Sequence, residues 1–236
     1  MDQPMLKLVI FDLDHTLLDW DRTQRFARQQ LNEKIVQHLS VDVFWQAYEV
    51  LHDTLWDAYM QQDLTVSEYH LYRYLKPLQQ CGIDDVDLAT TLNQSFMQHA
   101  LQHQHFCEGA EEALNLCQDL GLQMAVLTNG PTQGQLQKIR HLHLERWCTH
   151  YFISDEQGVA KPHPQAFLNV CQAFKLHPQQ CLMVGDDNEV DIQAAQQLGL
   201  HTYWISPAQQ QDTEIQSHTW TEFLSDLKQM FSPCET

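Results

Sequence analysis

Two acidic residues follow the first hydrophobic run of the chain. The apolar segment 6–11 is typical of a buried strand, and Asp12 and Asp14 come directly after it, with Thr16 two residues further on. Strands of an open parallel sheet present their chemistry at their carboxyl ends. Two carboxylates at such an end repel each other, and a divalent cation would offset that repulsion. The alternative is a strand followed by an acidic turn, because aspartate is also common in turns.

Three later segments carry side chains that complement this pair. They are Thr128-Asn129-Gly130 after the apolar run 123–127, Lys161 in the proline-stiffened loop 158–164, and Asp186, Asp187 and Asp191 after the apolar run 181–184. Together they add a hydroxyl, an amide, a cation and further carboxylates to the first strand end. A lone loop lysine is usually a solvated surface charge. The compatible order of all four segments favours a functional site instead.

In these motifs the sequence resembles the haloacid dehalogenase superfamily, specifically its phosphatases with a helical cap inserted after the first strand. The matching motifs are Asp12-x-Asp14-x-Thr16, Thr128-Asn129-Gly130, Lys161-Pro162 and Gly185-Asp186 followed by Asp191. The closest similarity is to the pyrimidine 5'-nucleotidase-like and N-acylneuraminate 9-phosphatase-like branches. The sequence departs from many relatives at His15 and Asp187, whose roles stay open.

The resemblance implies a role for each motif residue. Asp12 would be the nucleophile and Asp14 the general acid and base of phosphate-ester hydrolysis. Thr128 and the Asn129 amide would bind phosphate oxygens, and Lys161 would stabilise the nucleophile and the transferring group. A Mg²⁺ cofactor would be held by Asp12, Asp186 and the backbone carbonyl of Asp14, with Asp191 orienting a metal-bound water.

The substrate expected from the resemblance is a small phosphorylated metabolite. Nucleoside 5'-monophosphates are favoured, pyrimidine ones first, and sugar phosphates such as acylneuraminate 9-phosphates are the alternative. We hypothesise that Trp20 lines an apolar slot that stacks a nucleobase, whereas Trp45 and Trp56 fit a structural core better. Three other functions are weighed: 2-haloacid dehalogenase, which Asp14 disfavours because that branch lacks this second acid, phosphomutase and a non-catalytic binding protein.

Composition limits the partners. The chain has 236 residues, an apolar fraction of 43% and a net charge of −18. This acidity disfavours binding to nucleic acid polymers and to anionic membranes. The seven cysteines include no Cys-x-x-Cys pair. The sequence shows no signal peptide and no apolar stretch of membrane-spanning length, so a cytoplasmic protein is expected. It is expected to be a monomer or a homodimer.

Two periodicities predict the elements that position these residues. From residue 17 to 106 the apolar residues recur at helical spacing, and Thr65-x-x-Glu68 is a capping box. From residue 108 onward strands and helices alternate, as a parallel sheet requires. The predicted fold is therefore α/β: a Rossmann-like, doubly wound parallel sheet core of residues 1–17 and 106–236, with an α-helical bundle cap inserted at 18–105.

A second metal site is a weaker alternative. His99 and His103 are four residues apart, with His105 close by, but they lack a carboxylate partner. With 14 histidines in the chain, accidental pairs are common.

Overall fold

The computed structural model of this protein describes residues 6–206 and 217–231. The chain divides into two compact units, one of Met1–Trp20 with His105–Thr236 and one of Asp21–Gln104. The first junction lies three residues later than the sequence predicts and the second lies one residue earlier. Trp20 therefore belongs to the α/β unit, and not to the helical insertion in which the sequence placed it.

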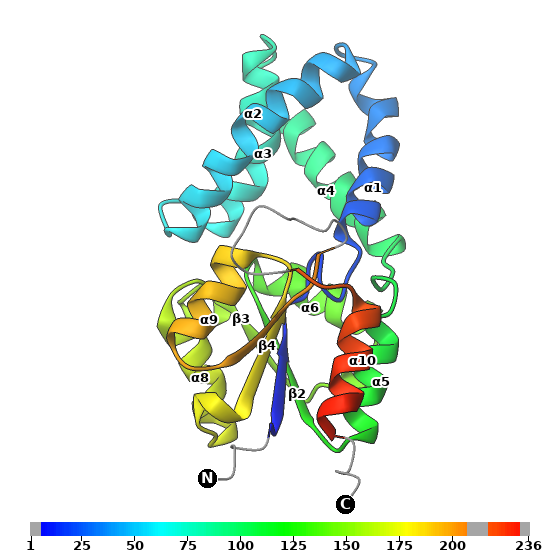
Figure 1. Ribbon diagram of the computed structural model, residues 1–236. Coiled ribbons are helices and arrows are strands. Elements are labelled where there is room, and N and C mark those ends of the chain that lie inside the picture. Colours follow the sequence, from blue (N-terminus) through cyan, green and yellow to red (C-terminus); the bar gives the residue numbers. More distant parts are fainter. Residues whose placement is uncertain (1–5, 207–216, 232–236) are drawn as a thin grey trace, which may run out of the picture. The chain divides into compact units, whose positions relative to one another are not determined.

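The α/β unit is built on a parallel sheet of five strands (Figure 1). The strands are β1 (Leu8–Phe11), β2 (Gln123–Thr128), β3 (His150–Ile153), β4 (Cys181–Gly185) and β5 (His201–Trp204), in the order β3-β2-β1-β4-β5. All four pairings are parallel, and Leu8 lies opposite both Gln123 and Cys181. The predicted Rossmann-like sheet is confirmed. The order reverses direction at β1, which makes its carboxyl end a topological switch point.

Helices cover both faces of the sheet. The helices of this unit are α5 (Ala110–Asp119), α6 (Thr132–His141), α7 (Ser154–Gln157), α8 (Pro164–Phe174), α9 (Ala194–Gln197) and α10 (Trp220–Phe231). Val9 and Phe11 of β1 pack in one core with α5, α6 and α10, whereas Leu8 and Ile10 pack in a second core with α8 and α9. Successive strand residues point to opposite faces, so an apolar run without alternation is what a sheet covered on both sides needs.

Short helical turns complete this unit. They are the 3₁₀ turns η1 (Leu144–Arg146) and η2 (Pro178–Gln180) and the π-helical segment η3 (Asn188–Gln193), which precedes α9. Gly121 and Gly199, the predicted left-handed helix ends, have φ angles of 71° and 81°. These are conformations that glycine adopts without steric cost.

The second unit is helical. It contains α1 (Trp20–Ile35) from its second residue onward, α2 (Val41–Met60), α3 (Val66–Gln80) and α4 (Val86–Gln102). Its buried side chains include Phe44, Tyr74 and Leu92. The predicted capping box begins α3: the Glu68 N–H donates to Thr65 Oγ1 at 3.2 Å, and the Thr65 N–H donates to Glu68 Oε2 at 2.9 Å.

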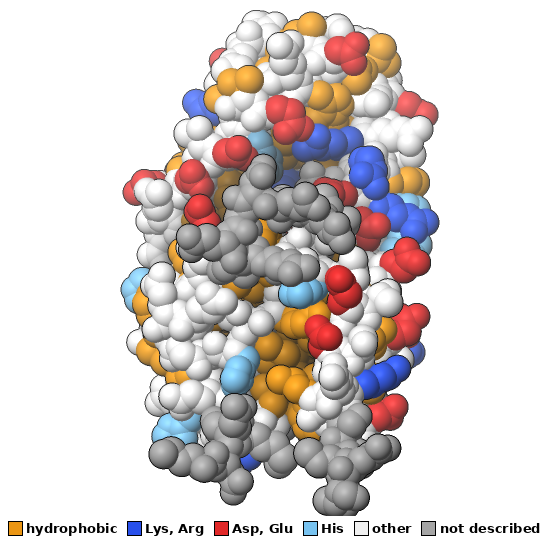
Figure 2. Space-filling view, viewed as in Figure 1, with side chains coloured by type: hydrophobic (Ala, Val, Ile, Leu, Met, Phe, Trp, Pro, Cys, Tyr) orange, Lys and Arg blue, Asp and Glu red, His pale blue; other side chains and the backbone are white. Residues whose placement is uncertain are grey.

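The surface reflects the acidic composition. On the face seen in Figure 2, acidic side chains lie over both units and basic ones are fewer, in keeping with the net charge of −18. Among residues 6–206 and 217–231, no helix combines the length and apolar character that a membrane span requires.

Candidate active site

The carboxyl ends of neighbouring strands bring the sequence motifs together. Asp12 follows β1, Asn129 follows β2 and Asp186 follows β4, and both β2 and β4 pair with β1. Because the pairings are parallel, the three strands end at one edge of the sheet. The first, second and fourth sequence motifs therefore meet there for a topological reason.

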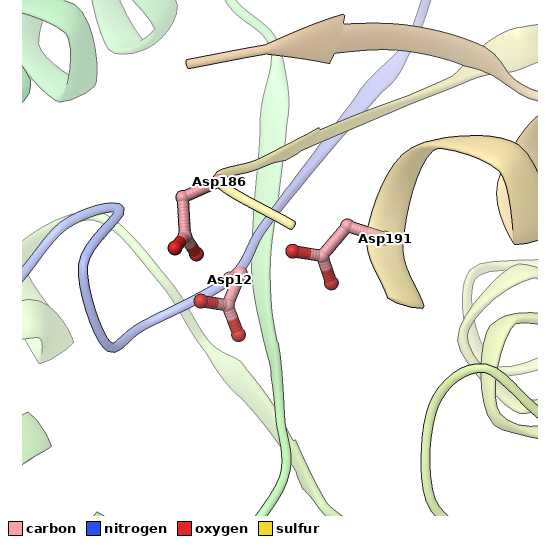
Figure 3. Close-up of side chains that lie close together, drawn as sticks. All are labelled: Asp12, Asp186 and Asp191. Atoms are coloured by element: carbon pink, nitrogen blue, oxygen red, sulfur yellow. The ribbon is translucent and has the colours of Figure 1, made fainter. Parts of the chain in front are cut away.

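Three carboxylates converge at this edge (Figure 3). Asp12, Asp186 and Asp191 each offer an oxygen atom, and these three atoms lie within 4.8 Å of one another. Among the described residues, no other group of three or more Asp, Glu, His or Cys side chains comes together in this way. Asp12 and Asp191 are buried. Carboxylate oxygens are the ligands that Mg²⁺ and Ca²⁺ prefer, so this donor set fits a hard divalent cation.

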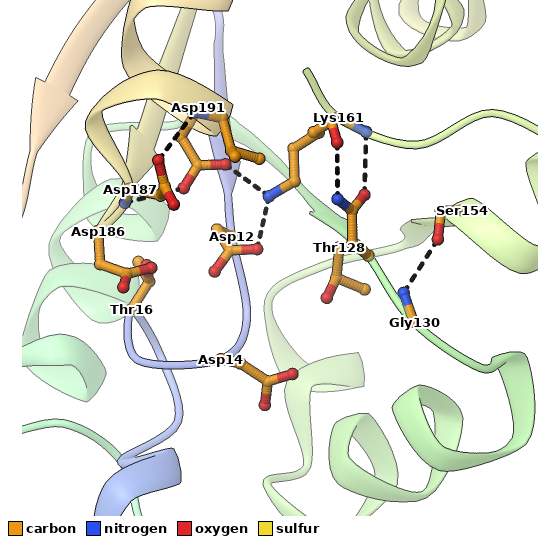
Figure 4. A network of polar contacts seen from close by, with 12 residues as sticks. Asp12, Asp14, Thr16, Thr128, Gly130, Ser154, Lys161, Asp186, Asp187 and Asp191 are labelled. Carbon is orange, nitrogen blue, oxygen red and sulfur yellow. Dashed lines mark hydrogen bonds and ion pairs between the residues drawn. The ribbon is translucent and has the colours of Figure 1, made fainter. Parts of the chain in front are cut away.

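Lys161 supplies the positive charge nearest to the carboxylates (Figure 4). Its Nζ atom lies 2.6 Å from Asp12 Oδ1 and 2.6 Å from Asp191 Oδ1, and its side chain is 2% exposed. Lys161 is therefore not a solvated surface charge, which was the alternative interpretation of the sequence. Asp191 lies inside the acidic cluster and pairs with Lys161, a contact that its spacing in the sequence does not reveal.

The clustering of like charges perturbs their titration. Burial, and next the charge of Asp12, raise the pKa of Asp186 to about 8. Burial also raises the pKa of Asp191 to about 7, although Lys161 opposes that increase. Burial alone would lower the pKa of Lys161, but Asp12 and Asp191 raise it above its ordinary value. The lysine therefore stays cationic, whereas Asp186 and Asp191 keep their protons to a higher pH than an ordinary aspartate. A bound cation would favour their charged forms.

Asn129 holds the lysine loop in place. Its side-chain Nδ2 donates to the Lys161 carbonyl at 2.8 Å, and its Oδ1 accepts from the Lys161 N–H at 2.9 Å. Beside it, the Gly130 N–H donates to Ser154 Oγ at 2.9 Å. The side-chain amide of Asn129 is thus engaged by the main chain of Lys161, so a phosphate contact from Asn129 would use its backbone N–H.

Asp14 is bound by two side chains of α6 that the motifs do not include. Lys138 Nζ lies 2.8 Å from Asp14 Oδ1 and 2.7 Å from Oδ2. Gln135 Nε2 donates to Asp14 Oδ2 at 3.0 Å and to Thr128 Oγ1 at 2.6 Å. The one signal in the sequence is their spacing, since residues three apart share one face of a helix.

The two departures from the family pattern have local roles. His15 has a φ of 62°, the left-handed conformation that glycine and asparagine adopt most easily. The Asp187 carboxylate accepts from the N–H groups of Glu189 and Val190 at 2.8 Å each, so it caps η3. Thr16 Oγ1 donates to Asp186 Oδ1 at 3.2 Å, which links the first and last motifs.

Trp20 contacts the lysine that binds Asp14. The ammonium of Lys138 is 3.8 Å from the centre of its ring, and the ring packs against the core of the α/β unit. One face of the indole is therefore occupied by a cation. A nucleobase would have to use the other face or displace Lys138.

His99 and His103 pack against one aromatic ring. His103 stacks on Phe26 with ring centres 4.2 Å apart, and His99 meets the same ring edge-on at 6.4 Å. No metal-binding group of three includes them within the described part of the chain.

Comparisons with known proteins identify the family and the fold. The model of the haloacid dehalogenase-like hydrolase family matches residues 6–199. Glyceraldehyde 3-phosphate phosphatase of Pyrococcus abyssi is 31% identical over 204 residues, which are 85% of this chain and 82% of that protein. Pyrimidine 5'-nucleotidase PynA of Streptococcus pneumoniae is 26% identical, over 85% of this chain and 84% of its own. The magnesium-bound crystal structure of the HAD-hydrolase YfnB from Bacillus subtilis superposes with a TM-score of 0.77 at 23% identity, covering 94% and 99% of the two chains.

The doubly wound sheet and the carboxylates at its switch point define an α/β enzyme with an acidic active site. The chain belongs to the haloacid dehalogenase-like hydrolase family. The relatives reported above include a phosphatase and a nucleotidase.

Proposed function

We propose that the protein is a Mg²⁺-dependent phosphatase of small metabolites that works through an aspartyl-phosphate on Asp12. The observation that carries this proposal is the ion pair between Lys161 and Asp12 at 2.6 Å, within a cluster of three carboxylates. A buried carboxylate held by a lysine beside a cation site has the surroundings that attack on a phosphate dianion requires.

The chemistry would proceed in two displacements on phosphorus. Asp12 attacks the phosphorus atom, the ester bond to the leaving oxygen breaks, and Asp14 gives that oxygen a proton. Water then attacks the same phosphorus atom, Asp14 takes a proton from it, and the bond to Asp12 breaks. Thr128, the Asn129 N–H and Lys161 would bind the phosphoryl oxygens.

Magnesium is the cation that the donor set supports. Asp12, Asp186 and the backbone carbonyl of Asp14 would hold the Mg²⁺ ion. Asp191 would orient a water molecule bound to that ion. When bound, Mg²⁺ neutralises negative charge on the phosphoryl group. The magnesium in the YfnB structure supports this choice.

The proposed substrates are nucleoside 5'-monophosphates, with pyrimidine nucleotides first, and the named activity of PynA supports them. Sugar phosphates are the second candidate, supported by the 31% identity to a glyceraldehyde 3-phosphate phosphatase. Because Lys138 covers one face of Trp20, the structure adds little support for base stacking there. A test of the substrate therefore needs both classes of compound.

The test is phosphate release from a panel of nucleoside monophosphates and sugar phosphates, with Mg²⁺ and with EDTA. Asp12→Asn removes the nucleophile, and Asp87→Asn, an exposed aspartate in the first turn of α4, serves as the matched control. We expect metal-dependent turnover in the wild type and in Asp87→Asn, and none in Asp12→Asn. Undiminished turnover in Asp12→Asn would contradict the mechanism. Isomerisation of a hexose phosphate or halide release without phosphate release would identify a mutase or a dehalogenase instead.

A further inference from the structure

Lys138 and Gln135 hold the carboxylate of Asp14 from the same face of α6. Asp14 lies in the turn after β1 and its side chain is 23% exposed. Three contacts of 3.0 Å or less fix it: two from Lys138 and one from Gln135. An acceptor-only carboxylate with both oxygens occupied is held in one orientation.

The ammonium of Lys138 is itself held on two sides. The Lys138 side chain is 9% exposed, the Trp20 ring lies on one side of the ammonium at 3.8 Å, and the Asp14 carboxylate is its ion-pair partner. Gln135 is 2% exposed and also donates to the Asn129 carbonyl at 3.2 Å. Both side chains are buried and packed before any ligand arrives, which is what a preorganised support needs.

We propose that Lys138 and Gln135 are positioning residues that aim the Asp14 carboxylate at the water that hydrolyses the aspartyl-phosphate. This inference rests on the proposed function. In that step one O–H bond of water breaks and its proton goes to Asp14, the water oxygen bonds to phosphorus, and the Asp12–phosphorus bond breaks. Lys138 and Gln135 hold the Asp14 carboxylate that accepts this proton. Trp20 then acts in the site by confining Lys138.

A substrate whose leaving group needs no proton distinguishes this positioning role from that of a purely structural salt bridge. With p-nitrophenyl phosphate, formation of the aspartyl-phosphate is independent of Asp14, whereas its hydrolysis still needs the base. Lys138→Met should therefore leave the first step intact and slow the second. We expect a burst of p-nitrophenol close to one equivalent per enzyme, followed by a steady rate about 10- to 100-fold below that of the wild type. This loss is smaller than the roughly 10²- to 10⁴-fold that a general base contributes, because Asp14 itself is still present.

Three companion variants complete the experiment. Lys138→Arg keeps the cation and should recover most of the steady rate. Gln135→Met should lose less of the steady rate than Lys138→Met, because Lys138 still contacts both oxygens of Asp14. Arg140→Met alters an exposed residue of the same helix and should behave as the wild type.

Two results would overturn the inference: a steady rate of Lys138→Met within about threefold of the wild type, or slow turnover without a burst, since a displaced loop slows both steps. Failure of the proposed function has a different signature. In that case the wild type itself releases neither p-nitrophenol nor phosphate from the metabolite panel.

Discussion

Lys161 reaches Asp12 across 149 residues of sequence, and its Nζ atom lies 2.6 Å from the Asp12 carboxylate. The pair is buried, and Asp191 shares the same ammonium. Removing one member of a buried ion pair leaves the other charge uncompensated, which makes this contact a determinant of stability as well as of activity.

Lys161→Met should therefore lose both activity and stability. We expect kcat to fall by roughly 10²- to 10³-fold, because a donor to the developing charge is lost. The metal-free variant should be destabilised by about 3–5 kcal/mol, the usual cost of breaking a buried pair. Urea unfolding with EDTA and with Mg²⁺ measures this. An unchanged midpoint in EDTA would show that the three carboxylates do not need the lysine.

The stability of the metal-free protein should decrease as the pH rises from about 4 to about 8. Burial raises the pKa of Asp186 to about 8 and that of Asp191 to about 7, whereas an unfolded aspartate titrates near 3.9. In that window the folded protein holds protons that the unfolded chain has lost, so by linkage each rise in pH favours unfolding.

Mg²⁺ should counteract this loss, because it binds the deprotonated carboxylates. The increase in Tm caused by saturating Mg²⁺ should thus be larger at about pH 8 than at about pH 6, and Asp186→Asn should flatten the metal-free profile. Melting curves at several pH values with and without Mg²⁺ decide the point. A Tm in EDTA that rises between these pH values would have the wrong sign.

Gly185→Ala should disable the acidic cluster without touching a carboxylate. A Cβ atom at Gly185 would lie 2.3 Å from Asp191 Oδ2 and 2.6 Å from Asp191 Cβ, so Asp191 and its contact to Lys161 would have to shift. We expect about 1–3 kcal/mol of destabilisation from overpacking and a weaker dependence of activity on Mg²⁺.

The control for this variant is Gly82→Ala, whose added methyl group meets no atom within 4 Å. Its φ of 82° imposes a conformational cost on alanine, so some loss of stability is expected there too. Its Mg²⁺ dependence should equal that of the wild type. Calorimetric titration of Mg²⁺ into the three proteins tests this, and equal affinities throughout would refute the steric argument.

Cys117 and Cys148 should resist thiol reagents in the folded protein. Both are fully buried, and burial raises the pKa of each to about 12, so little thiolate forms near pH 8. Cys81 and Cys107 are half-buried and serve as the reactive comparison. Alkylation followed by mass spectrometry should modify Cys117 and Cys148 only in denaturant. Modification of either at the rate of Cys81 would show that the core opens readily.

Local sequence patterns determined the helices and strands, and they also determined which strand ends carry the reactive side chains. An apolar run without alternation, such as Leu8–Phe11, specifies a strand that is covered on both faces. The motif Thr65-x-x-Glu68 specifies the start of α3. Both patterns act between residues that are close together in the chain. Parallel strands then require their ends to share one edge, so the meeting of Asp12, Asn129 and Asp186 followed from residue order.

Only the tertiary structure decided which side chains pair at that edge. Lys138 is 124 residues from Asp14, and the side chain of Asn129 donates to the main chain of Lys161. Such contacts depend on how α6 and the lysine loop pack beside β2, at a precision of about an ångström, and no local periodicity encodes that. For the same reason, Trp20 looked like part of the helical insertion in sequence but packs with the α/β unit in space.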